Sequence, residues 1–74
     1  MSVLQLNRIE YLICCIGSFA EYFGITNAQA YIYLNRYGGL DFLKKHYDIE
    51  HTFSIEDAVD DITRICHRNG GNLQ

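Results

Sequence analysis

The chain has 74 residues, an apolar share of 49% and a formal net charge of −3 at pH 7. This length fits one domain, residues 1–74, and the apolar share excludes an intrinsically disordered chain. Nucleic-acid-binding domains usually carry a basic face, so the acidic balance makes DNA or RNA an unfavoured partner.

The first predicted element is a helix over residues 4–23, whose side chains from Ile9 to Phe19 are apolar around most of its circumference. A helix that is hydrophobic all round belongs in the middle of a fold. We therefore expect Ile13→Asp to unfold the domain, because it would bury an unpaired charge. Gly17 in the helix interior predicts the close approach of another helix. The apolar run of about a dozen residues is too short to cross a membrane, which takes roughly 20.

Two shorter helices are predicted next. Thr26, with Gln29 three residues later, forms a capping-box pattern that opens a helix over residues 26–37. A Gly-Gly pair ends this helix, since one glycine suits the left-handed cap and the second lets the chain reverse. A third helix is predicted over residues 40–47.

The last predicted helix covers residues 54–68, with Ser54 as its N-cap and an amphipathic pattern along its length. Residues 48–53 have no sustained period and are predicted to be a connection. Residues 69–74 are predicted to be a frayed tail. The predicted architecture is an all-α, compact four-helix domain with a long central first helix.

Metal binding and catalysis are both disfavoured by the spacing of the reactive side chains. Three cysteines and three histidines are possible ligands, but no pair has the spacing of a zinc site. Cys14, Cys15 and Cys66 lie in apolar patterns, whereas a nucleophilic cysteine needs an electropositive and partly exposed setting. We expect no metal, no cofactor and no enzymatic activity. An odd number of cysteines and the lack of a positively charged signal peptide predict a cytoplasmic protein with reduced thiols.

Tyrosine is favoured at protein interfaces, and the chain has six tyrosines. The hypothesis that follows is a non-enzymatic interaction module with an aromatic helical surface, which forms a homodimer or binds a protein partner. The alternative is that the tyrosines line the core, with their hydroxyls at its rim. The polar cluster at residues 47–52 also has two interpretations, a recognition loop or a structural connection in which the His51 ring bonds to a backbone carbonyl. The candidate partner-binding residues are Tyr22, Tyr33, Tyr37, Tyr47, Asp48 and His51.

A small DNA-binding regulator is the alternative function. The helices predicted over residues 26–37 and 40–47 match a helix-turn-helix in outline. A recognition helix, however, reads bases near its N-terminal end. That end offers Leu40, Asp41 and Phe42 here, which is one acid between two core-like residues.

Several short motifs occur in a fixed order along the chain. They are Cys15-Ile16, Ala20-Glu21-Tyr22, Tyr37-Gly38, Phe42-Leu43, Tyr47-Asp48, His51-Thr52, Asp61-Ile62 and Arg68-Asn69-Gly70. With this set the chain resembles the DUF3791 family of short bacterial proteins of unknown function. It departs from the pattern at Glu50, where an aliphatic residue is frequent, and this charge argues against burial of the segment. Family members are often encoded beside proteins similar to ADP-ribosyltransferases, so the resemblance implies an antitoxin-like or immunity-like partner of a neighbouring toxin.

Overall fold

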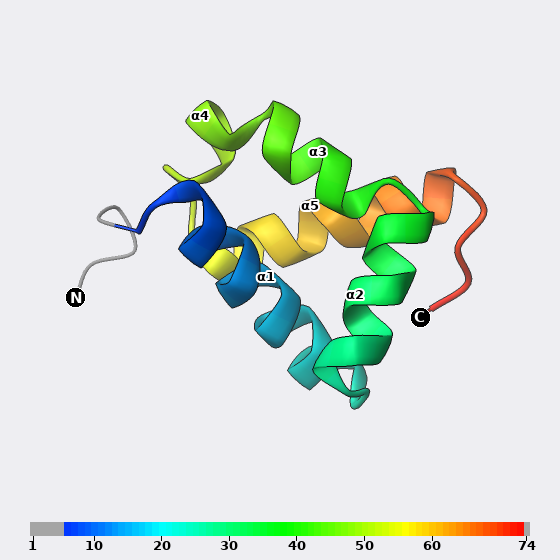
Figure 1. The fold of residues 1–74 in the computed structure, drawn as a ribbon. Helices are drawn as coiled ribbons and strands as arrows, with labels where there is room; N and C mark the ends of the chain where they lie inside the picture. The colour runs from blue at the N-terminus through cyan, green and yellow to red at the C-terminus, as the bar shows by residue number, and fades with distance from the viewer. Residues whose placement is uncertain (1–5, 74) are drawn as a thin grey trace.

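Five helices follow one another along residues 6–73, the part of the chain that the computed structural model describes (Figure 1). Within that part there is no strand, so the all-α prediction is confirmed. The additional helix is a single turn that forms in the segment predicted to be a connection. The helices are α1 (Arg8–Phe23), α2 (Asn27–Arg36), α3 (Gly39–Lys45), α4 (Tyr47–Glu50) and α5 (Ile55–Arg68).

Capping boxes decide where α1 and α2 begin. The Asn7 side chain accepts from the Glu10 N–H at 2.8 Å, and the Glu10 carboxylate accepts from the Asn7 N–H at 3.0 Å. Helix α1 therefore begins at Arg8, later than predicted; residues 4 and 5 of the predicted span lie outside the described residues. The predicted box of α2 is present, with bonds of 2.9 and 3.0 Å between Thr26 and Gln29.

Glycines shape the ends of the first two helices. Gly24 ends α1 in the left-handed region, at φ 66°, and Gly38 takes φ 84° before α3. Gly39 has a different role, since it is buried at the first position of α3. A Cβ atom there would lie 2.8 Å from Leu34 Cδ2 and 3.1 Å from Cys66 Sγ. Only glycine lets α2 and α5 approach the start of α3 this closely.

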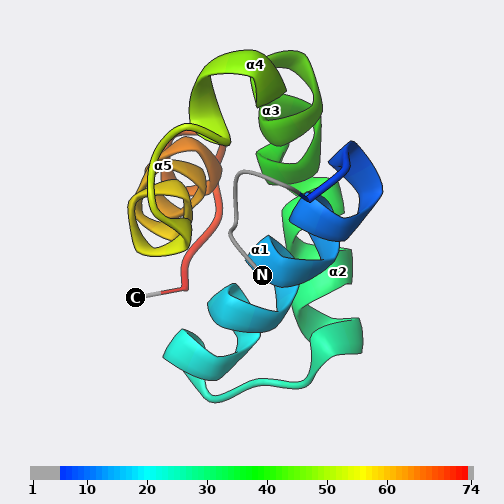
Figure 2. The ribbon, with the colours of Figure 1, turned by 90° about the vertical axis from the view of Figure 1, so that its left-hand side faces the viewer.

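The helices pack around one shared interior. Helices α1 and α2 are joined at a bend of 106°, and α5 packs against both α1 and α3. Figure 2 shows α5 on one side of the molecule and α1 and α2 on the other, with α3 and α4 across the top. The described chain measures 32 × 21 × 17 Å along its principal axes.

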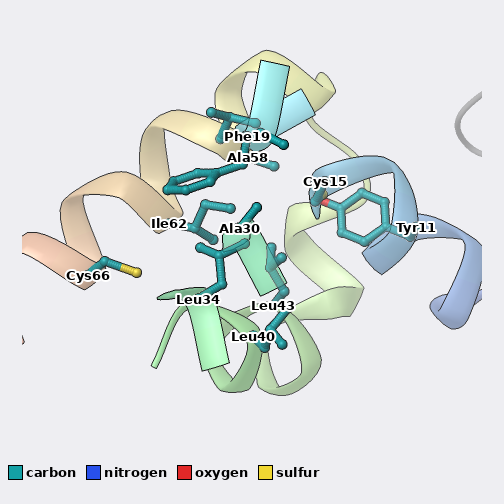
Figure 3. Close-up of a cluster of buried hydrophobic side chains, with 12 residues drawn as sticks. Tyr11, Cys15, Phe19, Ala30, Leu34, Leu40, Leu43, Ala58, Ile62 and Cys66 are labelled. Carbon is teal, nitrogen blue, oxygen red and sulfur yellow. The ribbon is translucent and has the colours of Figure 1, made fainter. Parts of the chain in front are cut away.

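One narrow face of α1 enters the core. Tyr11, Cys15 and Phe19, each four residues apart, are fully buried (Figure 3). Ile9 and Ile13 are 70% and 62% exposed, so the prediction of a helix buried all round is wrong. The expected unfolding by Ile13→Asp is wrong for the same reason. The other four helices cover α1 from one side only, because they are too short and too few to surround it. The rest of the core comprises Ala20, Ala30, Leu34, Leu40, Leu43, Ala58, Val59, Ile62 and Cys66.

The segment after α5 is ordered and packed, so the prediction of a frayed tail is wrong for residues 69–73. The Asn69 amide donates to the Tyr37 carbonyl at 2.8 Å, and the Leu73 N–H donates to the Tyr33 hydroxyl at 3.1 Å. Between them, Gly71 is buried and its N–H donates to the Cys66 carbonyl at 2.8 Å. These bonds fold the tail back onto α2.

Candidate functional site

The predicted cluster at residues 47–52 is built largely from contacts within the protein. The Tyr47 hydroxyl donates to the Leu6 carbonyl at 2.9 Å, and the ring meets Tyr11 edge-on at 5.5 Å. The His51 ring stacks on the Tyr47 ring with the ring centres 4.5 Å apart, and its Nδ1 donates to the Tyr47 carbonyl at 2.6 Å. The guanidinium of Arg8 lies 4.9 Å from the Tyr47 ring centre. Tyr47 and His51 thus have the structural role that was the alternative to a recognition loop.

The other predicted partner-binding residues divide by exposure. Tyr22 is 72% exposed, and Asp48 is exposed on α4. Tyr33 and Tyr37 are half-buried with their ring centres 4.8 Å apart, and Tyr33 also stacks on Phe19 at 5.8 Å. The structure therefore does not bring the six candidates together as one aromatic surface. Tyr22 and Asp48 are the two whose side chains are open to a partner.

Tyr22 borders an open groove between α1 and α5 with a volume of about 430 Å³. Three of its lining side chains are acidic, Glu21, Glu56 and Asp60, and the buried Val59 also lines it. A small-molecule site usually combines an apolar cavity with a few convergent polar groups. Here the acids lie on an exposed rim, so the groove lacks the enclosed polar contacts that would orient a small ligand.

Helix α1 also presents an exposed apolar face that sequence reasoning missed. Ile9, Ile13 and Gly17 are spaced by four residues and lie on one side of the helix, a set that we term the α1 stripe. Within the part of the chain that the structure describes, no atom would contact a Cβ at Gly17 within 4 Å, so the predicted close approach of another helix is wrong. The sequence did contain a signal for this face. The apolar residues around α1 form a larger surface than the other helices can cover.

A second feature that sequence reasoning missed is a buried polar cluster where α1, α4 and α5 meet. Glu50 is only 4% exposed, although its charge argued against burial of this segment, so that expectation is wrong. Burial, a hydrogen bond to the Asp61 carboxyl group and the Asp61 charge raise the pKa of Glu50 to about 7. Beside it, burial raises the pKa of the Tyr11 hydroxyl far above its usual range. Neither the Tyr11 hydroxyl nor Glu50 Oε1 has a hydrogen-bond partner among residues 6–73.

The buried thiols have the opposite environment from an activated nucleophile. Cys15 and Cys66 are fully buried, and burial raises the pKa of Cys15 to about 12 and that of Cys66 above its usual value. A reactive cysteine instead has a lowered pKa and access to solvent. Within residues 6–73, no three His, Cys, Asp or Glu side chains are placed to hold a metal ion.

The geometry of α3 bears on the DNA-binding alternative. Gly39 and Leu40, in its first turn, are buried against the rest of the fold, and Asp41 is the exposed side chain there. A recognition helix would present its base-reading side chains at this end. The basic residues Lys44 and Lys45 lie at the opposite end of α3.

Length and apolar character decide whether any of the described helices could cross a bilayer. None of them alone has both the length and the apolar character to cross a bilayer. The bent pair α1 and α2 passes the same criteria together, on length and composition only.

These features define a small all-α domain with an exposed apolar stripe on its first helix and a buried carboxyl group, that of Glu50, at the end of α4. Residues 10–69 match the family described as Protein of unknown function (DUF3791), and the chain belongs to this family. The matched segment reaches from the first turn of α1 to the end of α5, so the family match covers the helical core. No curated protein and no solved structure matches the chain.

Proposed function

We propose that the protein is a non-enzymatic interaction module that associates through the α1 stripe. The observation that carries this proposal is the exposure of Ile9 and Ile13, which are 70% and 62% accessible on a helix of a small domain. Burying an isoleucine side chain contributes about 1.5–3 kcal/mol, so the pair gives an interface a substantial apolar centre.

Gly17 is a second argument for an interface at the α1 stripe. A glycine in a helix interior costs up to about 1 kcal/mol relative to alanine. No atom of residues 6–73 would lie within 4 Å of a Cβ at Gly17, so the described fold does not require a glycine there. A partner helix that crosses α1 at this position would come closest where no side chain intervenes.

The partner is a second copy of the chain or a protein encoded by a neighbouring gene. In a symmetric dimer the two α1 stripes would face each other across a two-fold axis. The family resemblance implies a gene for an ADP-ribosyltransferase-like protein nearby. This favours a neighbouring toxin instead, with this protein as its antitoxin-like or immunity-like partner. A stable interface buries about 800 Å² on each partner. The stripe would form only the centre of either interface.

Sedimentation velocity tests the proposal with one variant and a matched control. We expect Ile13→Glu to abolish association, because the charge would be desolvated at the centre of the interface. Ile32 on α2 is 64% exposed, so Ile32→Glu makes the same change at similar exposure outside the stripe. This control should associate like the wild type.

The same pair of variants applies to a heterologous complex. The chain would be co-expressed with the product of the neighbouring gene, and recovery of the complex would be compared for wild type, Ile13→Glu and Ile32→Glu. The proposal fails if the wild type stays monomeric at high concentration and recovers no neighbouring product. It also fails if both variants associate equally well.

A further inference from the structure

The open groove between α1 and α5 continues along the outer side of α5. Two further hollows, of about 340 and 250 Å³, adjoin it, since both share Asp60 with it and the larger one also shares Tyr22. The part of α5 that borders them runs from Glu56 to His67, which is about 16 Å of helix. A depression of this length, open along its side, fits a segment of polypeptide better than a small molecule, which needs an enclosed site.

The groove combines a buried and an exposed apolar side chain. Val59 of α5 lines it and is only 5% exposed. Tyr22 of α1 borders it with its side chain 72% exposed, and its ring meets Phe23 edge-on with the ring centres 4.9 Å apart. An aromatic ring attracts a cation to its face, and long basic side chains bury their methylene stems on apolar surface. The pair therefore suits a basic side chain with a long stem.

Three carboxylates line the same groove. Glu56 and Asp60 are four residues apart and share one face of α5, and Glu21 lines the groove from α1. Within residues 6–73 the only salt bridge joins Arg64 to Asp61, at 3.8 Å, so no side chain of that part forms an ion pair with these acids. Like charges at this spacing destabilise a helix. The described chain thus leaves this negative charge uncompensated, and a cation from outside would offset the repulsion.

We propose that the groove between α1 and α5 binds an arginine-bearing segment of a partner protein. The guanidinium would lie against the Tyr22 ring and bond to the carboxylates, while the stem packs on Val59. Arginine suits this groove better than lysine, because its planar guanidinium stacks on aromatic rings and pairs with carboxylates in a bidentate manner. The groove adjoins the end of the α1 stripe, since Glu21 follows Gly17 by four residues, but its chemistry does not depend on that stripe.

A second copy of this chain is a less suitable occupant. The net charge is −3, so two copies repel each other at long range. Three of the four arginines already have partners within the fold. Arg64 pairs with Asp61, and Arg8 and Arg36 lie 4.9 and 5.5 Å from the centres of tyrosine rings. Charge complementarity therefore favours a different, basic protein.

Fluorescence anisotropy with labelled synthetic peptides tests the proposal on the full chain. The probe is an alanine-based helical peptide, of about the length of the groove, with arginine and leucine repeated at helical spacing. Otherwise identical peptides carry lysine or glutamate in place of arginine. We expect the arginine peptide to bind at low salt, the lysine peptide several-fold more weakly and the glutamate peptide not at all. Affinity should fall as salt is added, because exposed charges are screened.

Variants of the groove locate the binding site. Asp60→Asn and Tyr22→Leu should each weaken binding of the arginine peptide about three- to tenfold, through loss of an ion pair or of the cation–π contact. Asp41→Asn is the matched control, since it removes the same charge from an exposed aspartate on α3, outside the groove. It should bind like the wild type. Equal weakening by Asp60→Asn and Asp41→Asn would overturn the proposal, because total charge alone would then attract the peptide.

Two further measurements separate this groove from the α1 stripe and from self-association. Ile13→Gln removes apolar surface from the stripe without adding charge, and Ile13 does not line the groove. This variant should bind the arginine peptide like the wild type even where it no longer associates through the stripe. Sedimentation velocity at low salt tests a second copy as the occupant. Self-association that Asp60→Asn weakens would assign the groove to another copy of the chain and overturn the proposal.

Discussion

Replacing Gly71 by alanine should destabilise the domain, although this residue lies beyond the last helix. A Cβ atom at Gly71 would overlap the Tyr33 hydroxyl oxygen and lie 2.8 Å from Tyr33 Cζ and 2.9 Å from the Cys66 carbonyl oxygen. Cys66 cannot yield without moving α5. The Tyr33 ring is stacked on Phe19 and packs against Tyr37, so it cannot swing aside freely.

The size of the effect follows from these contacts. Overpacking a fixed site typically costs about 1–3 kcal/mol. If the tail lifts away instead, the hydrogen bonds from the Gly71 and Leu73 amides are lost, at about 1 kcal/mol each. Both routes give a loss of roughly 1–3 kcal/mol in the free energy of unfolding. For a domain of this size that lowers the melting temperature by at least about 4 °C.

Urea unfolding followed by circular dichroism measures this change. Asn72→Ala is the matched control, since Asn72 is the next residue and is exposed. We expect the control to unfold at the wild-type urea concentration and Gly71→Ala at a clearly lower one. Equal midpoints for Gly71→Ala and wild type would refute the packed tail, and so would rapid exchange of the Leu73 amide in the wild type.

Four further predictions concern α1. Ile13→Asp should change the free energy of unfolding of the monomer by no more than about 0.5 kcal/mol, because Ile13 is exposed. Phe19→Ala should cost about 3–5 kcal/mol, because Phe19 is fully buried; urea unfolding compares the two. Gly17→Ala should raise the melting temperature, with a gain of up to about 1 kcal/mol, since the new methyl group meets no atom. A thiol reagent should modify exposed Cys14 in the native protein and buried Cys15 only after unfolding; equal reaction rates would contradict the assigned core face.

The sequence predicted the helices best where local chemistry specifies them. The capping box of Thr26 and the N-cap at Ser54 are present at the predicted positions, and the Ser54 hydroxyl accepts from the Asp57 N–H at 3.0 Å. The amphipathic pattern of α5 also identified its buried residues, among them Val59 and Ile62. Caps and periodicity act over three or four residues, so a single segment contains all the information that they need.

The candidate site was less predictable from the amino-acid sequence. Six partner-binding residues were expected. The structure uses four of them in internal contacts, namely Tyr33, Tyr37, Tyr47 and His51, while Tyr22 and Asp48 remain open. An aromatic side chain suits an interface and a core equally well, so its residue type does not distinguish the two.

By itself, the sequence determined the all-α class, the N-caps Thr26 and Ser54, and the inward face of the amphipathic last helix. Tertiary structure decided which side of α1 is covered, because a helix that is apolar nearly all round offers several equivalent faces. It also buried Glu50 and folded the tail onto Tyr33. Each of these depends on where a distant element packs, and local periodicity holds no information about that position.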